Sequence, residues 1–137
     1  MANPYGVPIG LEYAKRAAAS ALTEARKNNW KMASAVVDTS STLVYFEKMD
    51  DTQTGSVKVA IAKARSAALF KRPTKEFQDT LAGGGTGLRV LALQGAVPVE
   101  GGMPLIVNDQ IVGAIGVSGG TSEQDGQCAK AAVNALT

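Results

Sequence analysis

The sequence contains no histidine, the side chain that most often serves proteins as a general base or a metal ligand. Any catalysis must therefore use carboxylates, Lys, Tyr, Ser, Thr or cysteine, or a cofactor, and we predict no zinc-type metal site. Cys128 is the single cysteine, so no disulfide can form within the chain. This usage is typical of a reducing compartment.

Long apolar runs and a dominant sign of charge are also missing. No stretch approaches the roughly 18 apolar residues of a membrane-spanning helix, and residues 1–6 lack the basic start of a secretory signal. We therefore expect a cytoplasmic protein that does not cross a membrane. With 14 basic and 12 acidic residues, the charge does not indicate a nucleic-acid partner. The basic stretch at residues 71–75 is favoured as a solvated helix end over a phosphate-binding patch.

Aromatic residues make up only 5% of the chain, whereas hydrophobic residues make up 45%. A chain of 137 residues with this content suffices for one domain, residues 1–137, whose core is built from Ala, Val, Ile and Leu. Neither an internal repeat nor a domain boundary is visible.

Hydrophobic periodicity predicts the elements of the first half. A helix is expected over 8–28, ended by the left-handed tendency of Asn28 and Asn29, and a hairpin over 30–37 and 43–49. A second helix, 56–70, has Ser56 as a possible N-cap. This helix is apolar on nearly every side, which predicts that a second copy of the chain packs against it in a homo-oligomer. Its apolar residues are Val57, Val59, Ala60, Ile61, Ala64, Ala67, Ala68, Leu69 and Phe70.

The second half is richer in glycine. A short helix over 74–80 precedes a glycine-rich segment, 81–87, expected to be irregular and mobile. A short segment at 88–93, a strand at 96–99 and a hairpin of 105–107 with 111–118 follow. Ser122 and Asp125 predict a capping box for the last helix. The order α-β-β-α-(α)-β-β-β-α indicates an α+β sandwich with about five antiparallel strands.

Three features are candidates for a binding site. The Gly101-Gly102 turn, followed by Pro104, suits either a tight turn or the close approach of a flat ligand. The turn Ser118-Gly119-Gly120 precedes a helix and offers backbone amides to a carboxylate or phosphate. Lys63 lies within an apolar helix, so its ammonium must extend to solvent along its aliphatic stem, pair with a carboxylate or face a cavity. Together they suggest a site for an anion.

Other chemistry-bearing residues have simpler interpretations. Asp38, Asp50 and Asp51 fall in turns, where Asp is common, and Glu47 lies on a strand, so a catalytic carboxylate pair is disfavoured. Cys128 is on the apolar stripe of the last helix and is expected to be an inert core thiol. The glycine-rich segment and the 118–122 turn match neither the dinucleotide fingerprint nor a phosphate-binding loop.

These motifs resemble the GlcG/HbpS family (DUF336) over almost the whole chain. The most specific are the 60–74 helix with Lys63 and the Gly101–Pro104 block followed by Gly113-Ala-Ile-Gly-Val-Ser-Gly119 and Asp125. The chain has Lys48-Met49-Asp50 where the family usually shows Arg-Met-Asp, and Asp109-Gln110 where it usually shows Asp-Gly. The resemblance implies a profilin-like α+β sandwich, homo-oligomers with ligand pockets near subunit contacts, and haem or a related tetrapyrrole as ligand.

The missing histidine separates this chain from relatives that hold haem iron through imidazole. If haem binds, Thr86, Tyr45 and Met49 are the candidate axial ligands, and coordination is expected to be weak. The leading hypothesis is a small oligomeric binding protein for a flat anionic ligand, with Lys63, Gly101, Gly102, Pro104, Ser118, Gly119 and Gly120 at its site. The alternative is a cofactor-independent lyase or isomerase for a small aromatic or hydroxy acid. In it Lys63 is the catalytic residue, and the Gly101-Gly102 or Gly119-Gly120 amides hold a carboxylate or oxyanion. An accessory protein without a ligand is a third possibility.

Overall fold

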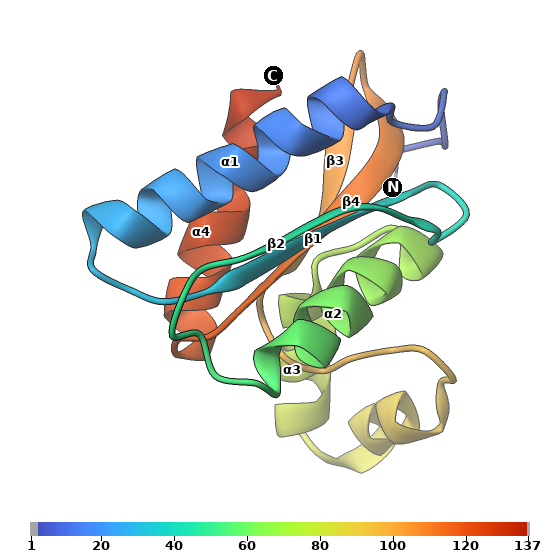
Figure 1. The fold of residues 1–137 in the computed structure, drawn as a ribbon. Helices are drawn as coiled ribbons and strands as arrows, with labels where there is room; N and C mark the ends of the chain where they lie inside the picture. The colour runs from blue at the N-terminus through green and yellow to red at the C-terminus, as the bar shows by residue number, and fades with distance from the viewer. Residues whose placement is uncertain (1–2, 137) are drawn as a thin grey trace.

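The computed structural model describes residues 3–136 as an α+β sandwich (Figure 1). Helices and strands alternate much as the hydrophobic pattern predicts. In chain order they are α1 (Leu11–Lys27), β1 (Ala33–Asp38), β2 (Leu43–Lys48), α2 (Ser56–Phe70), α3 (Thr74–Ala82), the 3-10 helix η1 (Gly85–Ala92), β3 (Gly102–Val107), β4 (Gln110–Ser118) and α4 (Ser122–Ala135).

The strands form one antiparallel sheet in the order β2-β1-β4-β3, with helices on both faces. Helices α1 and α4 cover one face, and α2 lies across the other (Figure 1). The larger core lies between the sheet and α1/α4, where the alanines and Leu22 of α1 pack with Val36 and Ile115 of the sheet. The smaller core lies under α2 and is built almost wholly from alanine. The fold class predicted from the sequence is confirmed.

Gly116 explains how α2 comes so close to the sheet. A Cβ atom on Gly116 would collide with the backbone of Ala60 and Ala64. The glycine therefore gives the helix room to pack directly on β4, and the cost of glycine in a strand is offset by this contact.

The fifth strand predicted at 96–99 is wrong, and the sheet has four strands. Amides in and directly after this segment donate hydrogen bonds to side chains of α2 and α3, not to a neighbouring strand. The Val97 amide donates to Ser66 Oγ of α2 (3.0 Å), and the Glu100 amide donates to Gln78 Oε1 of α3 (2.8 Å). The extended, β-branched segment therefore crosses from η1 to β3 without a ladder partner.

Several local predictions also need correction. The segment 81–87 is not irregular throughout, because α3 continues to Ala82 and η1 begins at Gly85. The capping box of α4 is formed by Thr121 and Gln124, one residue before the predicted pair. Asn29 does adopt the left-handed conformation after α1, with φ of 61°. Ser56 begins α2, but its hydroxyl accepts a hydrogen bond from Gln53 rather than capping the helix.

Candidate functional site

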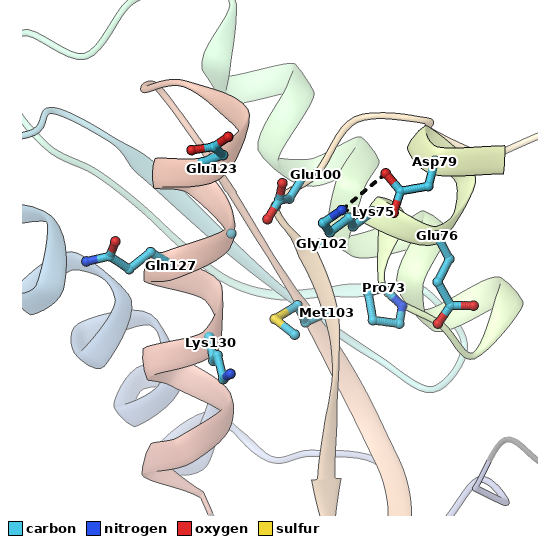
Figure 2. Close-up of a pocket in the computed structure, with 12 residues that line it drawn as sticks. Pro73, Lys75, Glu76, Asp79, Glu100, Gly102, Met103, Glu123, Gln127 and Lys130 are labelled. Carbon is cyan, nitrogen blue, oxygen red and sulfur yellow. Dashed lines mark hydrogen bonds and ion pairs between the residues drawn. The ribbon is translucent and has the colours of Figure 1, made fainter. Parts of the chain in front are cut away.

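A pocket of about 530 Å³ lies at the β3 edge of the sheet, between α3 and α4 (Figure 2). Because β3 is an edge strand, no further strand covers its outer side, and the two helices enclose the space beside it. The lining residues are Pro73, Lys75, Glu76, Asp79, Glu100, Gly101, Gly102, Met103, Glu123, Gly126, Gln127 and Lys130. Its volume falls within the range of small-molecule sites, about 300–1,000 Å³.

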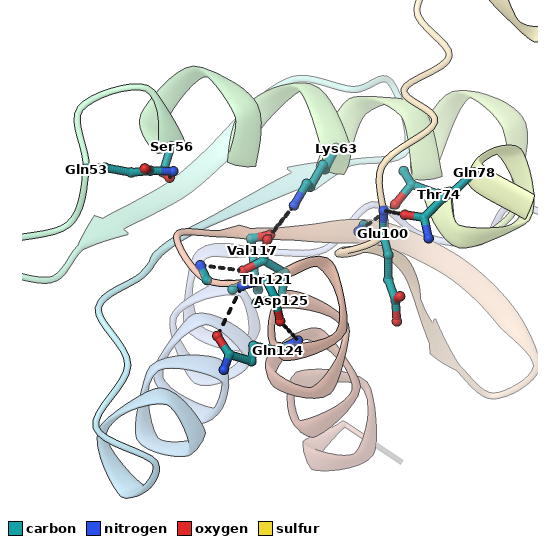
Figure 3. Close-up of polar contacts among 12 residues, drawn as sticks. Gln53, Ser56, Lys63, Thr74, Gln78, Glu100, Val117, Thr121, Gln124 and Asp125 are labelled. Carbon is teal, nitrogen blue, oxygen red and sulfur yellow. Dashed lines mark hydrogen bonds and ion pairs between the residues drawn. The ribbon is translucent and has the colours of Figure 1, made fainter. Parts of the chain in front are cut away.

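Lys63 lies directly behind this pocket, in a buried ion pair with Asp125 (Figure 3). Its Nζ is 2.8 Å from Asp125 Oδ2 and donates to the Val117 carbonyl at 2.9 Å. The two side chains are only 1% and 4% exposed. Of the roles that the sequence left open for Lys63, the structure shows the salt bridge, and Lys63 does not line the pocket.

Asp125 is also bonded to the turn that the sequence offered to an external anion. Its Oδ1 accepts a hydrogen bond from the Gly120 amide at 2.9 Å. Burial raises the pKa of Asp125, while the ammonium of Lys63 and the amides of Gly119 and Gly120 oppose that rise. The anion at the Ser118–Gly120 turn is therefore a carboxylate of the chain itself.

Gly101 separates the buried ion pair from the pocket. Its φ is 133°, a conformation that side-chain-bearing residues rarely adopt, and a Cβ atom there would lie 2.7 Å from Lys63 Nζ. The next amide, that of Gly102, donates to Thr74 Oγ1 of α3 at 2.9 Å. The wall of the pocket is thus bare backbone, supported from behind by Lys63 and from one side by Thr74.

The structure brings most of the predicted site residues together, but on two sides of this wall. Gly101 and Gly102 line the pocket. Lys63 and the 118–120 turn meet at Asp125 behind it, and Pro104 continues β3, buried opposite Ala114. The amides of Gly102 and Gly120, which the enzyme hypothesis assigns to an oxyanion, already donate to Thr74 and Asp125.

The rim of the pocket is strongly charged. Lys75 and Asp79 of α3 form an exposed ion pair of 2.8 Å, which Figure 2 shows beside Glu100. Asp79 raises the pKa of Lys75, and Glu100 and Glu123 add to this effect. Lys130 lies seven residues after Glu123 on α4, which places it about 10 Å along the helix axis. The carboxylates of Asp79, Glu100 and Glu123 thus make one end of the pocket acidic, and Lys130 lies toward the other end.

Met103, Glu100 and Lys130 line the pocket but were not among the site residues predicted from the sequence. Figure 2 shows the thioether side chain of Met103 in the space between β3 and α4. The signal was present, because Met103 follows the predicted Gly101-Gly102 pair directly, but only the glycines and Pro104 of that block were assigned to the site. Glu100 and Lys130 gave no signal, since their position depends on how α3 and α4 pack.

The three predicted axial ligands lie elsewhere. Tyr45 donates its hydroxyl to Glu47 at 2.7 Å on β2, Met49 lines a small pocket near the end of α1, and Thr86 belongs to η1. None of them lines the β3-edge pocket. They also do not share a pocket with one another.

The remaining reactive groups have structural roles. Cys128 is fully buried, and burial raises the pKa of its thiol to about 12. Asp38 Oδ1 accepts the Ser40 and Thr42 amides of its own turn. In residues 3–136, no group of three or more His, Cys, Asp or Glu side chains is arranged to hold a metal ion. None of the helices in that range is long and apolar enough to span a membrane.

Comparisons with known proteins agree with this architecture. Residues 9–134 match the family model described as "Haem degrading protein HbpS-like". Protein GlcG of Escherichia coli K12 is 38% identical over 112 residues, which is 82% of each chain. The crystal structure of Klebsiella pneumoniae ORFY superposes with a TM-score of 0.86 and 32% identity, covering 99% of this chain and 96% of that one.

A solved haem complex is also similar. The structure titled as the PduOC:heme complex has a TM-score of 0.84 and 26% identity and covers 96% of each chain. These matches extend over nearly all of the described fold, including both walls of the β3-edge pocket. The resemblance predicted from the sequence is confirmed, and the chain belongs to the GlcG/HbpS (DUF336) family.

Proposed function

We propose that this protein binds a flat anionic tetrapyrrole, haem being the first candidate, in the β3-edge pocket. The observation that carries the proposal is the bare wall at Gly101 and Gly102 with the Met103 thioether beside it. A wall without side chains accommodates a planar molecule, and a thioether is one of the side chains that ligate haem iron. The haem complex of a relative with the same fold supports the assignment.

The charges of the pocket determine how such a ligand is oriented. Haem carries two propionates, and the acidic end of the pocket at Glu100 and Glu123 repels them. Lys130, at the opposite end, is the ammonium that pairs with a propionate. Lys63 contributes indirectly, because its ion pair holds Gly101 in place. With Met103 and no imidazole, iron coordination is weak or exchangeable.

The enzyme hypothesis has less support. A lyase or isomerase needs a free cation or free amides at the reacting carbonyl. Lys63 Nζ is held by two oxygens, and the amides of Gly102 and Gly120 are engaged. We therefore favour binding over catalysis, in the cytoplasm as the sequence predicts.

Titration with hemin, followed by absorbance, tests the proposal. The wild-type protein is expected to give a saturable Soret band at one haem per subunit. Met103→Leu keeps the volume and removes the sulfur, so it should shift the band and weaken binding several-fold. Met49→Leu is the matched control at a distant pocket and should change neither property. Absence of a Soret band contradicts haem binding. A band shift seen only in Met49→Leu would show that the ligand binds at Met49 and not at Met103.

We also propose that copies of the chain associate through the outer face of α2. Leu69 is 50% exposed and Val59 38% exposed on this face, beside a groove of about 430 Å³ that also contains Ile61 and Val97. Light scattering is expected to give a multiple of the 14.1 kDa chain mass. Leu69→Lys should reduce this mass, whereas Leu91→Lys on η1, where the native leucine is 71% exposed, should not. A wild-type monomer at micromolar concentration contradicts the proposal.

A further inference from the structure

A second cavity of about 260 Å³ lies on the neighbouring face of α3, against η1. Its walls carry two arginines, Arg72 and Arg89, and two hydroxyls, Thr80 and Thr86. The floor includes Phe77 and Val90, each only 5% exposed. The cavity is therefore basic at its walls and apolar at its base, whereas the rim of the β3-edge pocket carries both carboxylates and lysines.

The packing of η1 on α3 builds this cavity. Gly87 of η1 is buried so closely on the Thr80 carbonyl that a Cβ atom there would collide with it. Phe77 is held from beneath by Phe70, whose ring meets it edge-on with centroids 5.4 Å apart. The floor is consequently fixed by tertiary contacts, and a ligand there would not have to order it.

The Arg72 side chain is held at the cavity by contacts with Phe70 and Phe77. Its Nε donates to the Phe70 carbonyl at 2.9 Å, and its guanidinium carbon lies 5.3 Å from the centre of the Phe77 ring. Both contacts leave the terminal Nη groups without a carboxylate partner among the described residues. Arg89 likewise forms no ion pair in that part of the chain, and Glu76 is the single carboxylate among the described lining residues.

We propose that this cavity binds a small organic carboxylate with an apolar body. Guanidinium groups bind carboxylates through paired, charge-assisted hydrogen bonds, and the hydroxyls of Thr80 and Thr86 add further donors to the wall. The apolar floor takes up the body of the ligand, which favours a carboxylate over a bare inorganic anion. The site gives a role to features that the haem proposal leaves unused: Arg72 of the basic stretch, Gly87 of the glycine-rich segment, and Thr86.

The site is independent of the tetrapyrrole proposal, because the two cavities have only Glu76 in common. Binding at one can therefore be measured while the other is empty or mutated. Cavity size limits the occupant to something much smaller than haem, such as a single substituted ring or a short chain.

The test is a titration of the full-length protein with benzoate and, separately, with inorganic phosphate, followed by NMR chemical shifts. Benzoate is expected to saturate at concentrations on the order of millimolar, shifting residues around Phe77 and Thr86, and to bind more tightly than phosphate. Arg89→Gln removes the charge of an exposed side chain and should weaken benzoate at least tenfold without changing the melting temperature. Arg26→Gln, on α1, is the matched control and should have no effect.

Three results would overturn the proposal. Benzoate that fails to saturate shows that no such site exists. Equal affinity for phosphate and benzoate shows that the apolar floor takes no part and that the arginines form only an anion patch. Equal weakening by Arg89→Gln and Arg26→Gln shows a general charge effect rather than binding in this cavity.

Discussion

Two lysine–aspartate pairs of equal length lie close to the β3-edge pocket, and they differ in almost every other respect. Lys63–Asp125 and Lys75–Asp79 each have a shortest distance of 2.8 Å between nitrogen and oxygen. The first pair is 1% and 4% exposed, and the second is 52% and 61% exposed. Distance alone therefore does not show what an ion pair contributes, because the surrounding solvent determines both its cost and its strength.

The buried pair links the elements behind the pocket. Lys63 comes from α2 and Asp125 from α4, and between them they bond to Val117 of β4 and Gly120 of the following turn. Each charge depends on the other, because an isolated buried charge is far more costly than a buried pair. The exposed pair connects two turns of α3 only, and water solvates either partner if the other is removed.

The largest expected effect follows from breaking the buried pair. Lys63→Met keeps the aliphatic stem and removes the ammonium, which leaves the Asp125 carboxylate buried without a counter-charge. We expect the free energy of unfolding to fall by about 3–5 kcal/mol, measured by urea denaturation. The double variant Lys63→Met/Asp125→Leu should recover most of the loss, since it removes both charges. A single-variant loss below about 1 kcal/mol would show that water reaches Asp125.

A second effect comes from Cys128, one turn after Asp125 on α4. Burial raises the pKa of its thiol from 9.0 to about 12, so the folded protein keeps the proton in a range where the unfolded chain releases it. The contribution of this thiol to the free energy of unfolding is therefore fully present below pH 9. As the pH rises toward 12, the free energy of unfolding falls by up to about 1.4 kcal/mol per pH unit. Unfolding measured between pH 8 and 11 should show this slope.

Other groups also titrate in alkaline solution, so a variant is needed to isolate the thiol. Cys128→Ala changes the stability at neutral pH by leaving a small cavity, but its alkaline slope should be shallower than that of the wild type. Parallel pH profiles for the two proteins would contradict the burial argument. Thiol reagents should also label native Cys128 slowly and the urea-unfolded chain rapidly at pH 8.

The comparison of the two pairs also shows what the sequence can and cannot predict. Helical spacing located α1 and α2, and an ammonium inside an apolar helix made a carboxylate partner one of the alternatives for Lys63. The partner itself was not predictable, because Asp125 lies 62 residues away and reaches Lys63 only after α2 and α4 pack on opposite faces of the sheet. A pattern records which face of an element is apolar, and it does not record which residue lies opposite.

The pocket shows the same limit. The Gly101-Gly102 pair was predicted to lie at the site because glycines allow a flat ligand to approach the backbone closely. The charges of its rim come from α3, from α4 and from Glu100 just before β3, and they surround one pocket because β3 is an edge strand. The strand predicted at 96–99 failed for a related reason. Its β-branched residues fit a strand, but the Val97 amide donates to Ser66 and Pro98 has no amide proton to give to a neighbouring strand.

The smallest expected effect on stability concerns the exposed pair, and it separates stability from binding. Lys75→Ala should leave the melting temperature unchanged, because solvent screens this pair and both side chains regain freedom when it is broken. The same change removes a positive charge beside Glu100 and Glu123, so the acidic end of the pocket becomes more negative. Hemin binding should therefore weaken a few-fold, and the difference from the wild type should shrink as salt is added. Asp79→Asn changes the rim charge in the opposite direction and should strengthen binding. If both variants weaken hemin binding equally, the pair acts by positioning α3, and the electrostatic argument for the orientation of the ligand is wrong.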